Sequence, residues 1–301
     1  MDKRHKSFSF SSLYLGTLSA GGITSGASGQ GTETDLERQI IDSQSTVLFT
    51  DEINLKNAQI AAEKIDTIKT IICVRNKGSS FVVPKGVVDY SEVIKGRPNL
   101  NVEPANPDDI AYLPYSSGTT GHVKGVMLTH KSLGTMADIN YNHFTHEIFG
   151  YLSEEPVDWH KETMFLHLPF YHVFGFGTLY FSLNAGCTGV VVPKFDALVF
   201  LKTLSSYRPT VLFLVPPLMV FLVKTPAVKK FDLSSIQCII TGAAPAGTVI
   251  CEEFLNTFPN VKYLGQGYGM TESTQASHLP LFDRRNCYDS VGVPAQTFEQ
   301  K

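Results

Sequence analysis

Five apolar residues stand in succession at Val211-Leu212-Phe213-Leu214-Val215, and the run Gln237-Cys238-Ile239-Ile240-Thr241 is apolar at its three central positions. A segment of helical length near 217–224 lies between the two runs. A strand with one wet face alternates apolar and polar residues, whereas a strand covered on both faces is apolar throughout. Both runs therefore predict buried strands of the kind found in parallel sheets.

The same alternation of short apolar runs and helical segments continues over the whole chain. Further strands are expected at Thr46–Thr50, Thr70–Val74, Ile110–Pro114, Val126–Thr129, Phe165–Leu168, Gly189–Val192 and Lys262–Gly265, and helices near 35–43, 54–64, 131–149, 173–184, 196–206 and 246–257. This rhythm predicts an α/β fold with layered, largely parallel sheets and helices on the sheet faces. Asn76–Asp109 is rich in glycine and proline and is expected to be a surface excursion between subdomains. Trp159 is expected in a surface loop.

Composition excludes several classes of protein. Of the 301 residues, 43% are hydrophobic and 18% charged, which allows a large core and excludes global disorder. Lys and Arg total 25 against 28 Asp and Glu, and this balance argues against a dedicated nucleic-acid binder. The five cysteines are an odd number without a C-x-x-C pair, which argues against a disulfide framework or a zinc site and favours a reducing compartment.

The first twenty residues have the outline of a signal peptide, because a charged start precedes the partly apolar stretch Phe8–Ala20. Serines interrupt that stretch, so a core helix is favoured over a signal peptide. Elsewhere no run approaches the roughly 18 apolar residues that a membrane-spanning helix needs. No transmembrane segment is therefore expected.

A loop suited to binding polyphosphate follows an expected strand and precedes another. It reads Leu113-Pro114-Tyr115-Ser116-Ser117-Gly118-Thr119-Thr120-Gly121-His122-Val123-Lys124-Gly125. Glycines let backbone N–H groups converge on an anion, hydroxyls add donors, and a lysine supplies a point charge. It is not a Walker A loop, which needs Gly-Lys-Ser/Thr in succession. A solvated turn is the simpler alternative, and the run of suitable residue types disfavours it.

From Ser116 to Lys124 the chain resembles the signature loop of the adenylate-forming superfamily, which includes acyl- and aryl-CoA ligases, 4-coumarate–CoA ligases, beetle luciferases and peptide-synthetase adenylation domains. Val123 departs from the pattern, in which proline is usual. Other segments resemble further family motifs in matching order: an early segment at Gly21–Ala27, an acyl-pocket motif at Leu168–Gly175, an adenine-contacting segment at Thr241–Pro245, and a nucleotide and magnesium motif at Gln266–Glu272. The resemblance covers nearly the whole chain and is closest to 4-coumarate–CoA ligase-like and luciferase-like members.

The resemblance implies a two-step reaction with ATP, Mg²⁺ and coenzyme A. A carboxylic acid is first converted to acyl-AMP and then to acyl-CoA. The residues implied as catalytic are Lys124, His172, Thr271 and Glu272, with Glu272 as the metal ligand. The residues implied to bind ATP or AMP are Ser116, Ser117, Gly118, Thr119, Thr120, Gly121, Lys124, Gly242, Ala243, Ala244, Gln266, Gly267, Tyr268 and Thr271, and those implied in the substrate pocket are Tyr171, His172 and Gly175.

Several of these residues also have plain structural readings. A histidine such as His172 among aromatics is often a satisfied core residue, Tyr268 could be a core tyrosine, and Thr271 could cap a helix. Gly242 and the alanines after it could serve close packing alone. For the acid, the aromatic residues near His172 admit an aryl or fatty substrate, and Gly175 and Gly177 are expected to leave room for it.

The resemblance also implies a domain organisation. Residues 1–301 are expected to form the large N-terminal adenylation domain, incomplete at both ends and without the small C-terminal domain. Two alternatives to a CoA ligase stay open: a truncated, non-catalytic nucleotide-binding module and a luciferase-like oxygenase. An intracellular location, cytoplasmic or peroxisomal, is expected, and the oligomeric state is left open.

Overall fold

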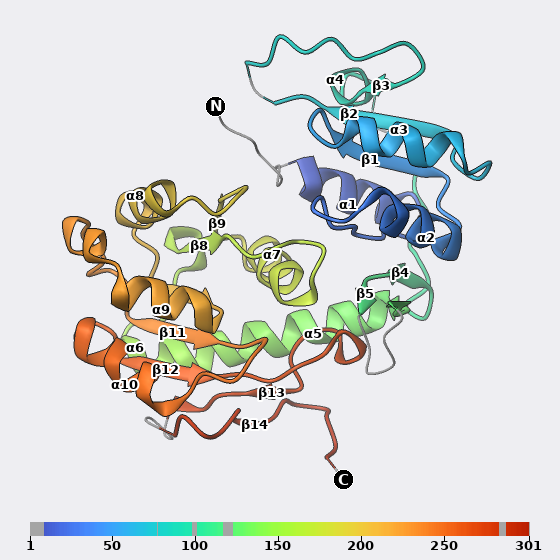
Figure 1. Cartoon of the computed structure of the whole chain (residues 1–301). Helices are drawn as coiled ribbons and strands as arrows, with labels where there is room; N and C mark the ends of the chain where they lie inside the picture. Colours follow the sequence, from blue (N-terminus) through green and yellow to red (C-terminus); the bar gives the residue numbers. More distant parts are fainter. Residues whose placement is uncertain (1–8, 77, 98–100, 117–122, 283–286, 301) are drawn as a thin grey trace. The chain divides into compact units, whose positions relative to one another are not determined.

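The computed structural model describes residues 9–76, 78–97, 101–116, 123–282 and 287–300 (Figure 1). These residues form two compact units that divide after His130.

The first unit contains a small parallel sheet with order β1-β2-β3. Strand β1 (Val47–Asp51) pairs in register with β2 (Thr70–Val74), and β2 pairs with β3 (Val88–Asp89). Its helices are α1 (Ser9–Ser19), α2 (Glu33–Ser43), α3 (Leu55–Glu63) and α4 (Tyr90–Val93). Helix α1 confirms that a helix forms near the N-terminus, although Tyr14 is its one buried residue. The expectation for Asn76–Asp109 is wrong in part, because its short strand β3 completes this sheet.

Two antiparallel pairs complete the first unit. Strand β4 (Ile110–Tyr112) pairs with β7 (Leu128–Thr129), and β5 (Tyr115–Ser116) pairs with β6 (Lys124–Gly125). The early segment also joins this region, since Thr24 bridges to Tyr112 in parallel. The larger sheets are parallel, as predicted, and these two antiparallel pairs are local exceptions.

The second unit is built on parallel strands that match the apolar runs of the sequence. Strand β10 (Val211–Leu214) pairs with β11 (Cys238–Thr241), which pairs with β12 (Tyr263–Gln266). A second parallel pair joins β8 (Thr163–Leu166) to β9 (Thr188–Val191), and β13 (His278–Leu279) pairs antiparallel with β14 (Val293–Pro294). All residues of β10, β11 and β12 are buried, which explains the unbroken apolar run of β10 and the apolar residues Cys238–Ile240 of β11.

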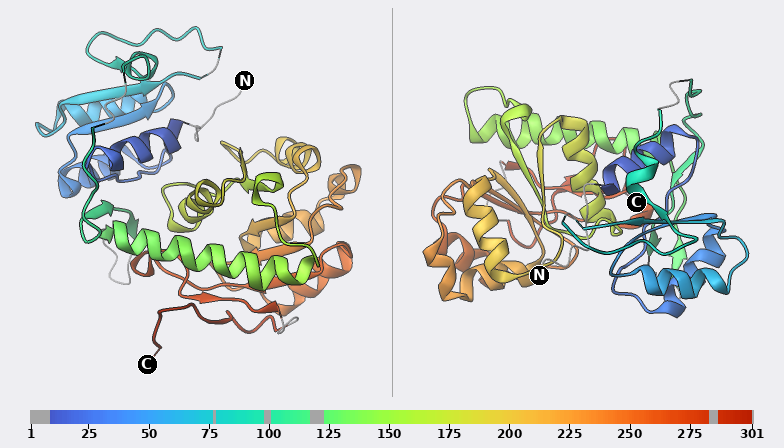
Figure 2. Two further views of the ribbon diagram at one scale, coloured as in Figure 1. Left: turned by 180° about the vertical axis from the view of Figure 1, so that it is seen from behind. Right: turned by 90° about the horizontal axis from the view of Figure 1, so that it is seen from above.

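Helices follow the strands of this unit as predicted. They are α7 (Val173–Ala185), α8 (Ala197–Tyr207), α9 (Pro216–Lys224) and α10 (Thr248–Thr257), with the short 3-10 segments η2 (Trp159–Lys161), η3 (Pro226–Lys230) and η4 (Thr271–Ser273). Helices α9 and α10 contact each other. The long helix that begins with α5 (His130–Asn142) lies in front of the strands of this unit in the left panel of Figure 2, which shows the molecule from behind. That helix continues through a π-helical stretch, η1 (His143–Phe149), into α6 (Gly150–Leu152).

The main core of the second unit lies among these strands and helices. Fully buried side chains include Phe200, Leu212, Leu214 and Phe254, and each contributes roughly 1.5–3 kcal/mol by leaving water. Trp159 corrects an expectation, because it is buried against Phe149 and Phe181 instead of lying in a surface loop. Within the described part of the chain, no helix is both long and apolar enough to cross a bilayer.

Candidate functional site

The two ends of the predicted phosphate loop lie opposite each other. Ser116 in β5 and Lys124 in β6 are partners in the antiparallel pair, while Ser117, Gly118, Thr119, Thr120, Gly121 and His122 lie outside the described residues. Lys124 is exposed, and among the described residues no carboxylate forms an ion pair with it. A lysine without a counter-ion is suited to meet an anion.

The base of this hairpin is anchored to α2. Tyr115 donates a hydrogen bond of 2.6 Å from its hydroxyl to Oδ2 of Asp42. Burial raises the pKa of Tyr115, so the phenol stays a donor. A Cβ on Gly125 would lie 3.2 Å from the Tyr115 ring, which explains the glycine beside Lys124. The early segment braces the preceding strand end, where Ser25 Oγ donates to the Leu113 carbonyl at 2.7 Å.

In the second unit, the other predicted residues follow the carboxyl ends of buried parallel strands. Gly242 comes directly after β11, Gly267 directly after β12, and His172 lies on the segment between β8 and α7. A Cβ on Gly242 would lie 3.3 Å from the Gly267 carbonyl oxygen and 3.8 Å from the Phe174 ring, so all three segments meet. Ligands of open α/β sheets bind at this edge.

The segment after β11 presents small residues to solvent. Gly242 is buried, but Ala243 and Ala244 are exposed, and Ala243 has a left-handed φ of 68°. Close packing alone therefore does not explain the two alanines. Small, exposed side chains at this position are compatible with the close approach of a planar base.

Gln266 supports this segment through its side chain. Its Oε1 accepts from the Ala246 N–H at 2.8 Å, and its Nε2 donates to the Ala246 carbonyl at 3.0 Å and to the Tyr288 carbonyl. The buried amide is thus fully occupied by protein. This geometry makes Gln266 a support for the loop 242–247, and its predicted contact with a nucleotide stays a prediction.

The segment after β12 closes on itself as a compact loop, residues 267–278. Tyr268 and His278 exchange backbone hydrogen bonds of 3.2 and 3.0 Å, which join the two ends. Ser273 Oγ accepts from the Met270 N–H at 3.1 Å and caps the short helix η4. The buried side chains of the loop are polar: Thr271, Ser273, Thr274 and Ser277.

This closed loop displays two of the predicted residues. Tyr268 is 51% exposed, which excludes a core role and leaves its ring available for stacking on a base. Glu272 is exposed, whereas Thr271 beside it is buried. Thr271 is the first residue of η4, but the cap of that helix comes from Ser273.

Two residues that were not predicted as site residues, Gln275 and Asn140, hold this loop in place. The side chain of Gln275 fills a notch on α7, because a Cβ on Gly177 would come within 2.0 Å of the Gln275 amide carbon. Asn140 on α5, only 4% exposed, donates to Gln275 Oε1 at 2.8 Å. The paired glycines Gly175 and Gly177 of α7 were the one sequence signal for the notch.

The expectation that Gly175 and Gly177 leave room for a substrate is wrong. A Cβ on Gly175 would lie 2.2 Å from the Pro169 carbonyl oxygen, and the space beside Gly177 is filled by Gln275. Both glycines allow close packing of α7 against neighbouring segments. Tyr171 is exposed near this turn.

His172 is the N-cap of α7. Its Nδ1 accepts a hydrogen bond of 3.2 Å from the Phe174 N–H. The ring reaches the surface, yet partial burial lowers its pKa. An Nδ1 that accepts carries no proton, so the neutral ring holds its proton on Nε2, which becomes a donor.

Oxygen atoms supply the chemistry needed for a nucleotide and Mg²⁺. At the end of β11, Thr241 Oγ1 is buried and has no hydrogen-bond partner among the described residues. Those residues also contain no cluster of three or more His, Cys, Asp or Glu side chains suited to a metal. The exposed Glu272 carboxylate fits a Mg²⁺ ion that takes its other ligands from phosphates and water, which is usual for this ion.

Comparison with known proteins agrees with this architecture. Acyl-CoA synthetase 7 of Caenorhabditis elegans is 34% identical over 265 residues, 88% of this chain and 48% of that protein. 4-Coumarate–CoA ligase 1 of Petroselinum crispum is 35% identical over 268 residues, 86% of this chain and 45% of that protein. This chain therefore spans about half the length of these curated relatives.

Solved structures show the same fold. A long-chain-fatty-acid–CoA ligase from Archaeoglobus fulgidus superposes with a TM-score of 0.81 at 23% identity, covering 96% of this chain and 55% of that one. The sequence profile of the AMP-binding enzyme family matches residues 5–301. The chain belongs to the AMP-binding enzyme family.

Proposed function

We propose that the protein containing this chain is an acid–CoA ligase. In the first step a carboxylate oxygen attacks the α-phosphate of ATP, which gives acyl-AMP and releases pyrophosphate. In the second step the thiol of coenzyme A attacks the acyl carbon, which gives the thioester and releases AMP. Adenylation is needed because a free carboxylate is a poor electrophile.

The observation that carries this proposal is the edge formed by three strand ends in the second unit. It exposes small residues at Ala243 and Ala244, an aromatic ring at Tyr268 and a carboxylate at Glu272. We assign Ala243, Ala244 and Tyr268 to the adenine, and Gly242, Gly267 and Thr271 to AMP more generally. Gln266 supports the first of these segments from behind.

The negative charge of the ATP phosphates is neutralised by residues of the phosphate loop and of the segment after β12. We assign Ser116 to Gly121 and Lys124 to the β- and γ-phosphates of ATP, and Glu272 to a Mg²⁺ ion. When bound, this ion offsets negative charge on the phosphates. The catalytic contribution of the protein is then mostly positioning and electrostatic stabilisation.

The acid is assigned to the neighbourhood of His172 and Tyr171. The neutral His172 ring offers an Nε2–H donor, which can orient a carboxylate oxygen without transferring a proton. The aromatic surroundings favour an aryl or fatty acid as the substrate class. An intracellular location, cytoplasmic or peroxisomal, is part of the same proposal.

Acid-dependent exchange of labelled pyrophosphate into ATP tests the first step. A panel of cinnamic, benzoic and medium-chain fatty acids is supplied with ATP and Mg²⁺, and Glu272→Gln is the matched variant. Exchange that requires an acid and falls in the variant supports the proposal. ATP binding without exchange in both the 301-residue chain and its longest native form favours the non-catalytic nucleotide-binding alternative. Oxygen uptake with an adenylated acid favours the luciferase-like alternative.

A further inference from the structure

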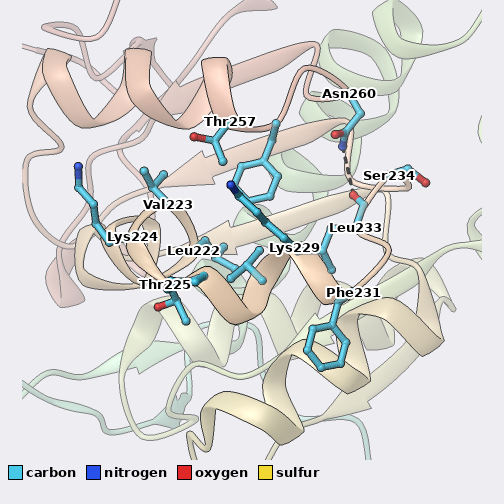
Figure 3. A pocket seen from close by; sticks show the side chains of 13 residues that line it. Leu222, Val223, Lys224, Thr225, Lys229, Phe231, Leu233, Ser234, Thr257 and Asn260 are labelled. Atoms are coloured by element: carbon cyan, nitrogen blue, oxygen red, sulfur yellow. Dashed lines mark hydrogen bonds between the residues drawn. The ribbon is translucent and has the colours of Figure 1, made fainter.

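The second unit has a pocket away from the strand ends described above. It lies where α9 and η3 meet the last turn of α10, next to the residues that precede β11 and β12 (Figure 3). Its volume is about 400 Å³, within the usual range for small-molecule sites. Because β11 and β12 are parallel, this pocket lies at their amino ends, whereas the proposed nucleotide site lies at their carboxyl ends.

The floor of the pocket is apolar. Leu222, Val228, Leu233 and Phe258 line it and are all at least nine-tenths buried. Its walls add hydroxyl and amide groups from Thr225, Ser234, Thr257 and Asn260. The Asn260 amide donates to the Leu233 and Ile236 carbonyls, which holds the rim in shape.

The charged residues that line the pocket are both cationic. They are Lys224 and Lys229, and no aspartate or glutamate lines it. Lys224 is already paired with Glu253 and points away from the centre, whereas Lys229 crosses the middle of the pocket (Figure 3). Among the described residues Lys229 forms no ion pair.

We propose that this pocket binds an amphipathic monocarboxylate. Its apolar chain lies against the partly exposed side chains of Val223 and Phe231, above the buried floor, and its carboxylate pairs with Lys229. A purely apolar molecule would leave Lys229 without a partner, and a small anion would leave the apolar floor without a contact. The proposal goes beyond the proposed function and does not rest on it, since it concerns a different end of the sheet.

Titration of the 301-residue chain with sodium octanoate by calorimetry, without ATP, tests the proposal. Lys229→Gln should weaken octanoate binding about tenfold or more, because one charge-assisted hydrogen bond is lost. The matched control is Lys230→Gln, which removes an exposed neighbouring lysine that does not line the pocket. Binding in this control should equal that of the wild-type chain.

A second pair of variants tests the volume independently of charge. Thr257→Trp fills the pocket from an exposed wall position and should abolish octanoate binding, whereas Asn256→Trp, next to it and outside the lining, should not. Unchanged octanoate binding in both Lys229→Gln and Thr257→Trp overturns the proposal. Equal affinity for acetate overturns the role of the apolar floor, and equal affinity for 1-octanol overturns that of Lys229. Acid-dependent pyrophosphate exchange is measured separately, so failure of one proposal leaves the other intact.

Discussion

Asn140 on α5 donates a hydrogen bond of 2.8 Å to the side chain of Gln275, which belongs to the loop after β12. The bond is largely buried, and it fixes the orientation of the Gln275 amide in the notch at Gly177. Through this amide, α5 and α7 together hold the loop that displays Tyr268 and Glu272.

Loss of this hydrogen bond should loosen the loop. Asn140→Leu leaves Gln275 Oε1 without its donor, and we expect a loss of roughly 1–3 kcal/mol in the free energy of unfolding. Urea titration measures it. Combining Asn140→Leu with Gln275→Met should cost less than the sum of the single changes, because both partners are then removed. Strict additivity would contradict the coupling.

The notch on α7 should reject a methyl group. In Gly177→Ala the new Cβ overlaps the Gln275 amide, and we expect a destabilisation of roughly 1–3 kcal/mol and weaker AMP binding. The control is Gly134→Ala on α5, where no atom lies within 4 Å of the new Cβ. That change should be neutral or stabilising by up to about 1 kcal/mol, since alanine favours helix. If Gly134→Ala lowered the melting temperature more than Gly177→Ala, tight packing of Gln275 against Gly177 would be excluded.

Two variants of His172 should separate its role as the cap of α7 from its proposed role in binding the substrate. His172→Ala removes the acceptor for the Phe174 N–H and should cost about 1 kcal/mol of stability. His172→Asn keeps an acceptor near that position, so stability should recover while the Nε2–H donor stays missing. We therefore expect acid-dependent exchange to remain low in both variants. Full recovery of exchange in His172→Asn would mean that the cap is the only role.

His143 should make stability depend on pH. Burial lowers the pKa of His143 to about 4, from 6.5 for an exposed ring. Between pH 6.5 and 4 the unfolded chain therefore binds a proton that the folded chain does not, so stability falls as the pH falls. The full effect is on the order of 3 kcal/mol. The urea midpoint of the wild type should fall more steeply between pH 6.5 and 4 than that of His143→Gln, and parallel curves would exclude this assignment.

Lys124 should distinguish triphosphate from monophosphate. Lys124→Ala should weaken ATP binding about tenfold or more, by loss of a charge-assisted hydrogen bond, and leave AMP binding nearly unchanged. Lys131→Ala, another exposed lysine, serves as the control. Calorimetric titrations with both nucleotides give the comparison. Equal losses for ATP and AMP would contradict a role at the β- and γ-phosphates.

The sequence predicted the parallel strands well because burial on both faces leaves an unbroken apolar run, as in β10 and β11. It also predicted that Gly242 and Gly267 lie close to the carboxyl ends of buried strands. Strands were also predicted where β4 and β7 lie, but their antiparallel pairing was not. The strands β5 and β6 were missed, since strands of two residues carry too little pattern.

Contacts between distant segments could not be predicted. The burial of Trp159 depends on Phe149 and Phe181, and the notch at Gly177 depends on a glutamine almost a hundred positions away. The burial of Trp159 and the notch at Gly177 both depend on tertiary packing, which the neighbouring sequence does not reveal. The functional assignments of the predicted site residues and the domain organisation stay predictions.

The side chain of Gln266, at the end of β12, holds the loop that follows β11. One buried amide holds both the N–H and the carbonyl of Ala246, so the ends of β11 and β12 cannot shift independently. The loop that carries the alanines is therefore tied to the end of β12, next to Tyr268, without any ligand. A base that binds there meets a preorganised surface, and little conformational entropy is lost on binding.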